Sequence, residues 1–267
     1  MEPGVAKALT SEPPRVSRWN GYERQDYTFS GRAVRLVKPR AAATGNPWLW
    51  RAEFPDSAPA TDKALLAKGW HVAYYKVSNL YGAPVALDAM DGFYEHATNT
   101  LKLSPTPVLV GVSRGGLYAM NWTARHPDKV AAVYLDAPVC DFKSWPMGLW
   151  KGQRARNGKM EIMRSYGFKT EEELMAYTGN PVDNLAPVAR HRVPIISVVG
   201  TADKVVPLEE NTAVLEKRYR ELGGEILVIR KEGVGHHPHG LENDPSPIVD
   251  FILKKTKERR ANGAACK

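Results

Sequence analysis

Short runs of hydrophobic residues recur along this chain and alternate with longer stretches in which hydrophobic and polar residues mix. The runs are rich in β-branched and aromatic residues, as is typical of strands, and lie at residues 48–50, 71–77, 108–112, 130–135, 195–199 and 226–229. Most of the mixed stretches begin or end at proline or glycine, which are helix start and stop signals, and they lie at residues 62–68, 84–101, 115–125, 208–222 and 247–257. The pattern predicts alternating strands and helices.

This alternation predicts an α/β fold built on one mostly parallel central sheet with helices on both faces. Parallel strands need long crossover connections, which helices usually provide. The sequences PVLVGV and PIISVVG are almost continuously apolar, and such runs are typical of strands buried on both faces. Ahead of the alternation, residues 27–29 and 33–37 flank Ser30-Gly31 and predict a hairpin.

Two segments depart from the alternation. Residues 1–25 carry proline and arginine without a hydrophobic run, so we expect a poorly ordered leader followed by one domain over residues 26–267. Residues 141–192 separate two predicted strands that a single helix would connect, and residues 171–177 among them have a helical pattern. Because a long insertion at a strand end is usually functional, we interpret this segment as a helical cap.

The composition is that of an ordinary globular protein. The 267 residues are 43% hydrophobic and 25% charged, which excludes collagen-like, coiled-coil and wholly disordered classes. Two cysteines, Cys140 and Cys266, are too few for a disulfide framework or a cysteine-based metal site. No apolar run is long enough to predict a membrane span. No hydrophobic segment near the start predicts a secretion signal, and the compartment stays open.

The net charge of +8 suggests a nucleic-acid or anionic partner until its distribution is considered. Residues 254–267 carry a net charge of +5 and residues 151–160 a net charge of +4, so the rest of the chain is close to neutral. A groove that follows a nucleic-acid backbone needs basic residues spread along it. We therefore expect no nucleic-acid partner, and we interpret the basic part of the cap as a feature that attracts anionic substrates.

The sequence GVSRGG, centred on Ser113, lies between a predicted strand and a predicted helix. A sharp turn in this position presents a serine at the carboxyl edge of the sheet, where ligands bind in open α/β folds. Glycines at 111 and 115 allow the backbone to pass close to the turn, and the start of the helix offers backbone N–H groups beside the serine. We predict that Ser113 is a nucleophile; the alternative is an ordinary glycine-rich turn.

A serine nucleophile needs a base, and the base needs a carboxylate that orients it. Asp203 lies in the loop after the predicted strand at 195–199, and His236 lies in the loop after the predicted strand at 226–229. The chain order of serine, aspartate and histidine is the order of the α/β-hydrolases. The sequence therefore contains a candidate for each of the three roles.

The segments GVSRGG, VVGTADKVVP and GVGHHPHG resemble the nucleophile, acid and histidine blocks of the α/β-hydrolases, and DNLAPVARHRVPI resembles the lead-in to the acid strand. The resemblance runs from about residue 27 to the last predicted helix. It implies Ser113 as nucleophile, His236 as general base and then acid, Asp203 as the orienting carboxylate, and no cofactor. WRAEF followed by GWHVAYYKVSNLYG also resembles bacterial α/β-hydrolases that accompany polysaccharide-degrading enzymes, which implies a carbohydrate ester as substrate.

Other residues near these positions stay open as alternatives. His237 and His239 lie in the same loop as His236, which we prefer because it directly follows Gly-Val-Gly. Asp136 and Asp141 follow the predicted strand at 130–135, where some α/β-hydrolases carry the acid. Three histidines within four residues also suggest a metal site. Pro238 interrupts them and no second Cys/His cluster exists, so we predict no metal site.

The tetrahedral intermediate of such a reaction needs two hydrogen-bond donors for its oxyanion. We expect one to be the backbone N–H of Arg114 and the other to come from the loop after residues 48–50, at Ala52 or Glu53. The side chains of Arg51, Glu53 and Arg114 are predicted at the mouth of the site. Two arginines there would favour an acidic or polyhydroxylated acyl substrate, unless they pair with local carboxylates.

Several aromatic residues are candidates for lining a sugar- or aryl-binding cleft. They are Trp145 and Trp150 in the predicted cap, together with Trp48, Trp50 and Tyr81. Aromatic residues of this kind are often core residues instead.

Together these features predict a serine hydrolase that cleaves a carboxylic ester through an acyl-enzyme. The expected substrate is a small molecule or a saccharide that carries a short-chain acyl or methyl ester. A peptidase or amidase with the same three residues is one alternative, and a non-catalytic binding module on the same fold is another. Neither a membrane nor a nucleic acid is expected as partner, and the oligomeric state is undetermined.

Overall fold

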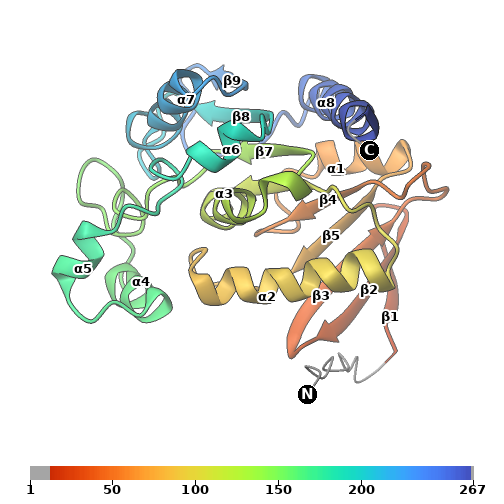
Figure 1. Cartoon of the computed structure of the whole chain (residues 1–267), viewed down its shortest axis with the longest axis horizontal. Helices are drawn as coiled ribbons and strands as arrows, with labels where there is room; N and C mark the ends of the chain where they lie inside the picture. The colour runs from red at the N-terminus through yellow and green to blue at the C-terminus, as the bar shows by residue number, and fades with distance from the viewer. Residues whose placement is uncertain (1–12, 266–267) are drawn as a thin grey trace.

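The computed structural model describes residues 13–265, apart from the side chains of residues 260 and 262–265 (Figure 1). Its centre is one sheet of nine strands in the order β1-β2-β3-β5-β4-β6-β7-β8-β9. The strands are β1 (Arg15–Trp19), β2 (Tyr22–Phe29), β3 (Arg32–Lys38), β4 (Trp48–Arg51), β5 (His71–Tyr75), β6 (Val108–Val112), β7 (Ala132–Asp136), β8 (Ile195–Gly200) and β9 (Ile226–Lys231). The first four strands in this order, β1, β2, β3 and β5, pair antiparallel with one another. From β5 onward, through β4, β6, β7, β8 and β9, every neighbouring pair is parallel. The predicted mostly parallel sheet is confirmed.

Helices cover both faces of the sheet, as the alternation predicts. They are α1 (Ala60–Ala67), α2 (Pro84–Glu95), α3 (Gly115–Arg125), α4 (Gly158–Tyr166), α5 (Glu171–Ala176), α6 (Ala186–Arg190), α7 (Thr212–Glu221) and α8 (Ser246–Ala265). Apolar residues of α1 and α8 share one buried cluster with the sheet, and those of α2, α3, α6 and α7 share the other. None of the helices among residues 13–265 is long and apolar enough to cross a membrane.

Alternation along β4 shows how one short strand contributes to both clusters. Trp48 and Trp50 enter the cluster of α2 and α3, whereas Leu49 enters the cluster of α1 and α8. The rings of Trp48 and Trp50 stack at a centroid distance of 5.3 Å, and Trp50 lies 4.9 Å from the ring of Trp122 on α3. Because both β4 tryptophans are almost completely buried, the suggestion that they line a substrate cleft is wrong.

We expected a poorly ordered leader over residues 1–25, and this prediction is wrong for residues 13–25, the part that the structure describes. β1 and β2 form a hairpin at the edge of the sheet, closed by Asn20 and Gly21, whose φ angles are 48° and 81°. Asn-Gly is a strong hairpin signal, because the favoured two-residue turn needs a positive φ at both positions. The hairpin was missed because β1 is largely exposed, with Val16 62% accessible, and so lacks an apolar run. Residues 1–12 lie outside the described part.

The long segment between β7 and β8 contains α4, α5 and α6. In Figure 1, α4 and α5 lie apart from the sheet, whereas α6 joins the helix layer on one of its faces. α4 is attached to the loop after β5, because Ser165 Oγ donates to the Asn79 carbonyl (3.3 Å) and Tyr166 Oη donates to the Tyr81 carbonyl (2.9 Å). Tyr81 Oη in turn donates to Glu161 of α4.

We expect Gly116→Ala to destabilise the protein by about 1–3 kcal/mol, the usual cost of adding volume to a packed interior. A Cβ at this position, in the first turn of α3, would lie 2.6 Å from the Val139 carbonyl oxygen and 2.7 Å from Pro138 Cβ. The matched control is Gly92→Ala in α2, where nothing lies within 4 Å of a Cβ. It should stabilise by up to about 1 kcal/mol. Urea unfolding followed by circular dichroism measures both, and equal effects would contradict the packing argument.

Candidate functional site

Ser113 occupies a sharp turn between β6 and α3. Its φ angle is 49°, a left-handed conformation that is uncommon for a residue with a side chain. The backbone around it is held on both sides, because the Ser113 N–H donates to the Asp136 carbonyl (2.8 Å) and its carbonyl accepts from Val139 N (2.9 Å). A Cβ on Gly111 would lie 2.9 Å from the Gly115 carbonyl oxygen, so the turn requires a glycine before the serine.

Three side chains from three different loops form one hydrogen-bonded series at this turn. Ser113 Oγ lies 3.0 Å from His236 Nε2, and His236 Nδ1 lies 2.7 Å from Asp203 Oδ2. The second carboxylate oxygen of Asp203 accepts from the backbone N–H groups of Val205 (2.8 Å) and Val206 (2.9 Å). The side chains of His236 and Asp203 are 8% and 2% exposed, so the imidazole is oriented by a carboxylate that is itself fixed.

Gly200, at the end of β8, brings the Asp203 and His236 loops together. A Cβ on Gly200 would overlap the carbonyl oxygens of Val234 and Gly235, just before His236. Ala202 N also donates to the Val234 carbonyl (2.9 Å), which joins the two loops directly. No motif of the sequence predicts a role for Gly200, although a glycine directly after a continuous apolar run is a signal for a close backbone approach.

The alternative histidines and carboxylates have other partners. His239 Nδ1 lies 2.8 Å from Asp136 Oδ1, so this pair is separate from the series at Ser113. Asp141 Oδ1 accepts from the backbone N–H of Lys143 (2.8 Å), and burial raises the pKa of its carboxyl. His237 is exposed, and within residues 13–265 neither of its ring nitrogens has a hydrogen-bond partner. Desolvation, and then repulsion by the neighbouring His239 and His236, lower the pKa of His237.

The predicted hydrolysis needs backbone N–H groups that are free to bind an oxyanion. The N–H of Ala52, one of the predicted donors, already has an acceptor. It donates to the Val110 carbonyl (2.9 Å), because the parallel pairing of β4 with β6 continues one residue past the strand. Within the described part of the chain, the N–H groups of Glu53 and Arg114 have no acceptor. The Ala52 prediction is therefore wrong, and Glu53 is the remaining candidate beside Arg114.

Arg51 does not reach the mouth of the site, and its prediction as a substrate-binding residue is wrong. Its side chain is 0% exposed and its Nε lies 2.6 Å from Asp62 Oδ2. The other guanidinium nitrogens donate to the carbonyls of Phe54 (3.1 Å) and Ala58 (3.2 Å). A strand-end arginine that looks exposed in the sequence is buried here because α1 places a carboxylate against it.

Glu53 and Arg114 pair with each other near Ser113. Arg114 Nε lies 3.1 Å from Glu53 Oε2, and Arg114 Nη1 donates to Asn79 Oδ1 (3.0 Å). Glu53 is 3% exposed and also accepts from Ser78 Oγ (2.6 Å). The sequence left open that arginines at this position pair with local carboxylates, and Arg114 does so. Its guanidinium charge is directed toward the carboxylate of Glu53.

The two cap tryptophans differ in environment. Trp145 is partly buried, with its ring centroid 6.2 Å from that of Tyr81, whereas Trp150 is 56% exposed. Neither position by itself tests a role in substrate binding, so that role stays a prediction.

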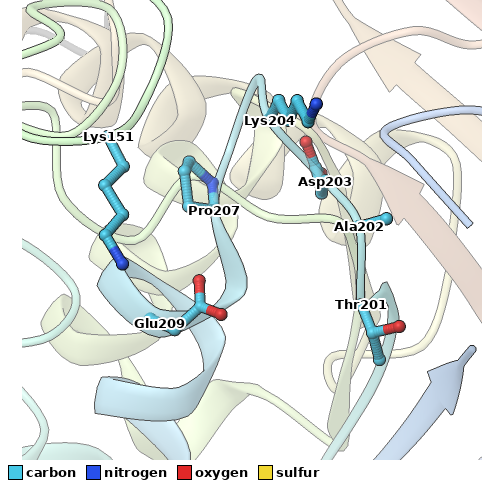
Figure 2. A pocket seen from close by; sticks show the side chains of 7 residues that line it. All are labelled: Lys151, Thr201, Ala202, Asp203, Lys204, Pro207 and Glu209. Carbon is cyan, nitrogen blue, oxygen red and sulfur yellow. The ribbon is translucent and has the colours of Figure 1, made fainter. Parts of the chain in front are cut away.

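A pocket of about 240 Å³ lies beside Asp203. Figure 2 shows Lys151, from the segment between β7 and β8, across the pocket from Asp203 and Lys204, with Glu209 below. Neither Ser113 nor His236 lines it. This pocket is therefore next to Asp203, and the other two residues of the series do not line it.

Solved structures of other proteins share this architecture over almost the whole length of this chain. Acetyl xylan esterase 1 from Thermoanaerobacterium sp. superposes with a TM-score of 0.61 at 14% sequence identity, over 93% of this chain and 90% of that chain. This chain has the α/β-hydrolase fold. The elbow turn at Ser113 and the mixed sheet agree with that fold.

Other α/β-hydrolase structures match this chain over only a part of their own length. Acylaminoacyl peptidase from Pyrococcus horikoshii superposes with a TM-score of 0.60 at 15% identity, over 92% of this chain and 42% of that chain. A puromycin-hydrolyzing peptidase from Mycobacterium tuberculosis gives a TM-score of 0.61 at 14% identity, over 95% and 39%. No protein-family model matches the sequence, and no curated protein does.

We expect Arg51→Met to lower the free energy of unfolding by about 3–5 kcal/mol, since it leaves Asp62 buried and uncompensated. The double variant Arg51→Met/Asp62→Leu should recover most of that loss, because it removes both buried charges. Lys217→Met is the control, because Lys217 and Glu221 form an exposed pair at 73% and 57% side-chain exposure and should change stability by less than about 1 kcal/mol. Denaturant unfolding checks all three, and a double variant as unstable as Arg51→Met would contradict this account.

Proposed function

We propose that this α/β-hydrolase-fold protein is a serine hydrolase that cleaves carboxylic esters through an acyl-enzyme. The single observation that carries the proposal is the hydrogen-bonded series from Ser113 through His236 to Asp203. The serine is on a strained turn at the carboxyl end of β6. A serine hydroxyl bonded to an imidazole that a buried carboxylate orients is the arrangement that activates it as a nucleophile.

In the first half of the proposed reaction, Ser113 Oγ attacks the ester carbonyl carbon and its proton passes to His236 Nε2. The Asp203 carboxylate keeps the Nδ1–H in place and stabilises the imidazolium. The N–H groups of Arg114 and Glu53 bind the oxyanion, with support from the positive end of α3. His236 then donates its proton to the leaving alcohol as the carbon–oxygen bond breaks.

In the second half, water attacks the acyl-enzyme. His236 accepts a proton from the water, the second tetrahedral intermediate forms with the same oxyanion donors, and its collapse releases the carboxylic acid. The proton returns from His236 to Ser113 Oγ, which restores the starting state. The first and the last of these proton transfers use the 3.0 Å contact between Ser113 Oγ and His236 Nε2, and the other two run between His236 and the leaving alcohol or the attacking water.

An ester of a carbohydrate is the proposed substrate class. The acetyl xylan esterase matches this chain over nearly the full length of both, whereas the peptidases are matched over less than half of their own chains. This difference in coverage favours esterase over peptidase activity. The segment between β7 and β8 is proposed to act as a cap, with Trp145 and Trp150 as candidate contacts for a saccharide.

We expect Ser113→Ala to lower kcat for p-nitrophenyl acetate by at least about 10⁴-fold, since removing the nucleophile of such a triad disables the whole unit. The control is Ser246→Ala, at an exposed serine at the start of α8, which should keep the wild-type rate. A fluorophosphonate probe should label wild type and the control but not Ser113→Ala. A folded wild-type protein that takes up no label would favour the non-catalytic binding module instead.

Matched ester and amide substrates separate the two proposed activities. Acetylated sugars and p-nitrophenyl acetate should show a higher kcat/KM than acetyl-p-nitroanilide. Methyl-esterified sugars test whether the protein cleaves methyl esters as well as acyl esters. Subtracting the Ser113→Ala rate removes hydrolysis that does not depend on the site. Faster cleavage of the anilide than of the ester would favour the peptidase or amidase alternative.

A further inference from the structure

Three imidazoles converge on one side of the Ser113 site. One nitrogen from each of His236, His237 and His239 lies within 4.8 Å of the others. Their ring centroids are 4.5 to 5.0 Å apart. These are three of the seven histidines in the chain, and the fold of a single loop after β9 brings them together despite the intervening Pro238.

Two of the three rings are oriented in the way that metal-binding histidines usually are. A histidine that binds a transition metal almost always donates its other ring N–H to a carboxylate or carbonyl, which fixes its tautomer and orientation. His236 Nδ1 lies 2.7 Å from Asp203, and His239 Nδ1 lies 2.8 Å from Asp136. The Asp136 carboxylate is itself fixed by Tyr134 Oη (2.8 Å) and Gly240 N (2.6 Å).

The ring of His237 is free to rotate, because no carboxylate in the described part of the chain holds it as Asp203 holds His236 and Asp136 holds His239. His237 is exposed, and within residues 13–265 neither of its nitrogens has a hydrogen-bond partner. Tetrahedral zinc holds its imidazole nitrogens at about 2.0–2.1 Å, which separates them by roughly 3.4 Å. Nitrogens that lie as far as 4.8 Å apart must therefore approach by an ångström or so. Rotation of His237 brings its nitrogen toward the other two rings, and a small tilt of His236 and His239 closes any remaining separation between those two.

The sequence alone predicts no metal site here, but the convergence of the three rings changes that expectation. We propose that His236, His237 and His239 form an inhibitory binding site for a divalent transition-metal ion, with Zn²⁺ as the best fit. Imidazole nitrogens favour zinc and its neighbours over magnesium or calcium, which take oxygen ligands. Three protein ligands leave the fourth tetrahedral position to water.

Inhibition follows from the two hydrogen bonds of His236, and this step rests on the proposed function. One ring nitrogen of His236 contacts Ser113 and the other contacts Asp203. A metal bound at either nitrogen therefore replaces one contact of the series. Binding at Nε2 removes the acceptor for the serine proton, and binding at Nδ1 removes the orienting carboxylate. Metal binding and ester hydrolysis are thus mutually exclusive.

The first arm of the test measures binding without activity. Tag-free Ser113→Ala protein is titrated with ZnCl₂ by calorimetry and with CoCl₂ by visible absorption, alone and combined with His237→Ala, His237→Gln or His191→Ala. His191 is the matched control, because it is an exposed histidine whose ring Nδ1 lies 3.0 Å from the carbonyl oxygen of Pro187, four residues away. We expect one equivalent of zinc, at least about tenfold weaker binding in both His237 variants, and unchanged binding in His191→Ala.

The second arm measures hydrolysis of p-nitrophenyl acetate against zinc concentration. Each protein with an intact Ser113 is compared with its own zinc-free rate. Zinc should inhibit wild type and His191→Ala alike, excess EDTA should restore the rate, and the His237 variants should need at least about tenfold more zinc.

Equal zinc binding by Ser113→Ala protein with and without the His237 substitutions, or no stoichiometric binding at all, overturns the proposal. So does inhibition that both His237 variants retain unchanged, because zinc would then act elsewhere. A wild-type protein that hydrolyses no ester would refute the proposed function and leave the binding arm intact, so the two failures are distinguishable.

Discussion

Asp136, at the end of β7, connects the two loops on which the site depends. Its carbonyl accepts from the N–H of Ser113, and its carboxylate binds His239 and the N–H of Gly240. The strained serine turn and the histidine loop are therefore fixed to the same residue. Because that residue is 1% exposed and lies in the middle of a parallel sheet, the relative position of serine and histidine follows from the pairing of β6, β7 and β8.

A second buried connection holds the opposite side of the site. Arg51 ties β4 to α1 through Asp62 and holds the loop that carries Glu53 through two carbonyls. Glu53 then meets Arg114, the residue after Ser113. The loops that carry the backbone donors proposed for the oxyanion are thus held by charged side chains that pair with each other and with local carbonyls. Buried arginine and glutamate here shape the loops, and they do not need to touch a ligand to matter.

Most of the fold could be predicted from the chain because each strand of the parallel region is a short, nearly continuous apolar run. The elbow at Ser113 was identifiable for the same reason, since a glycine-rich turn between a buried strand and a helix is a local feature. β1 was missed because an exposed edge strand has no apolar run. The Ala52 prediction was wrong because strand pairing extends past β4, which depends on the neighbouring strand and not on the local sequence.

The sequence by itself determined which loops carry the serine, the aspartate and the histidines, because those loops follow directly from the order of strands and helices. Only the tertiary structure decided which of three adjacent histidines faces Ser113, since His239 is held by a carboxylate 103 residues away. It also decided that Arg51 is buried against Asp62 and that the three imidazoles converge. Contacts between residues far apart in the chain set these outcomes, and no local pattern records them.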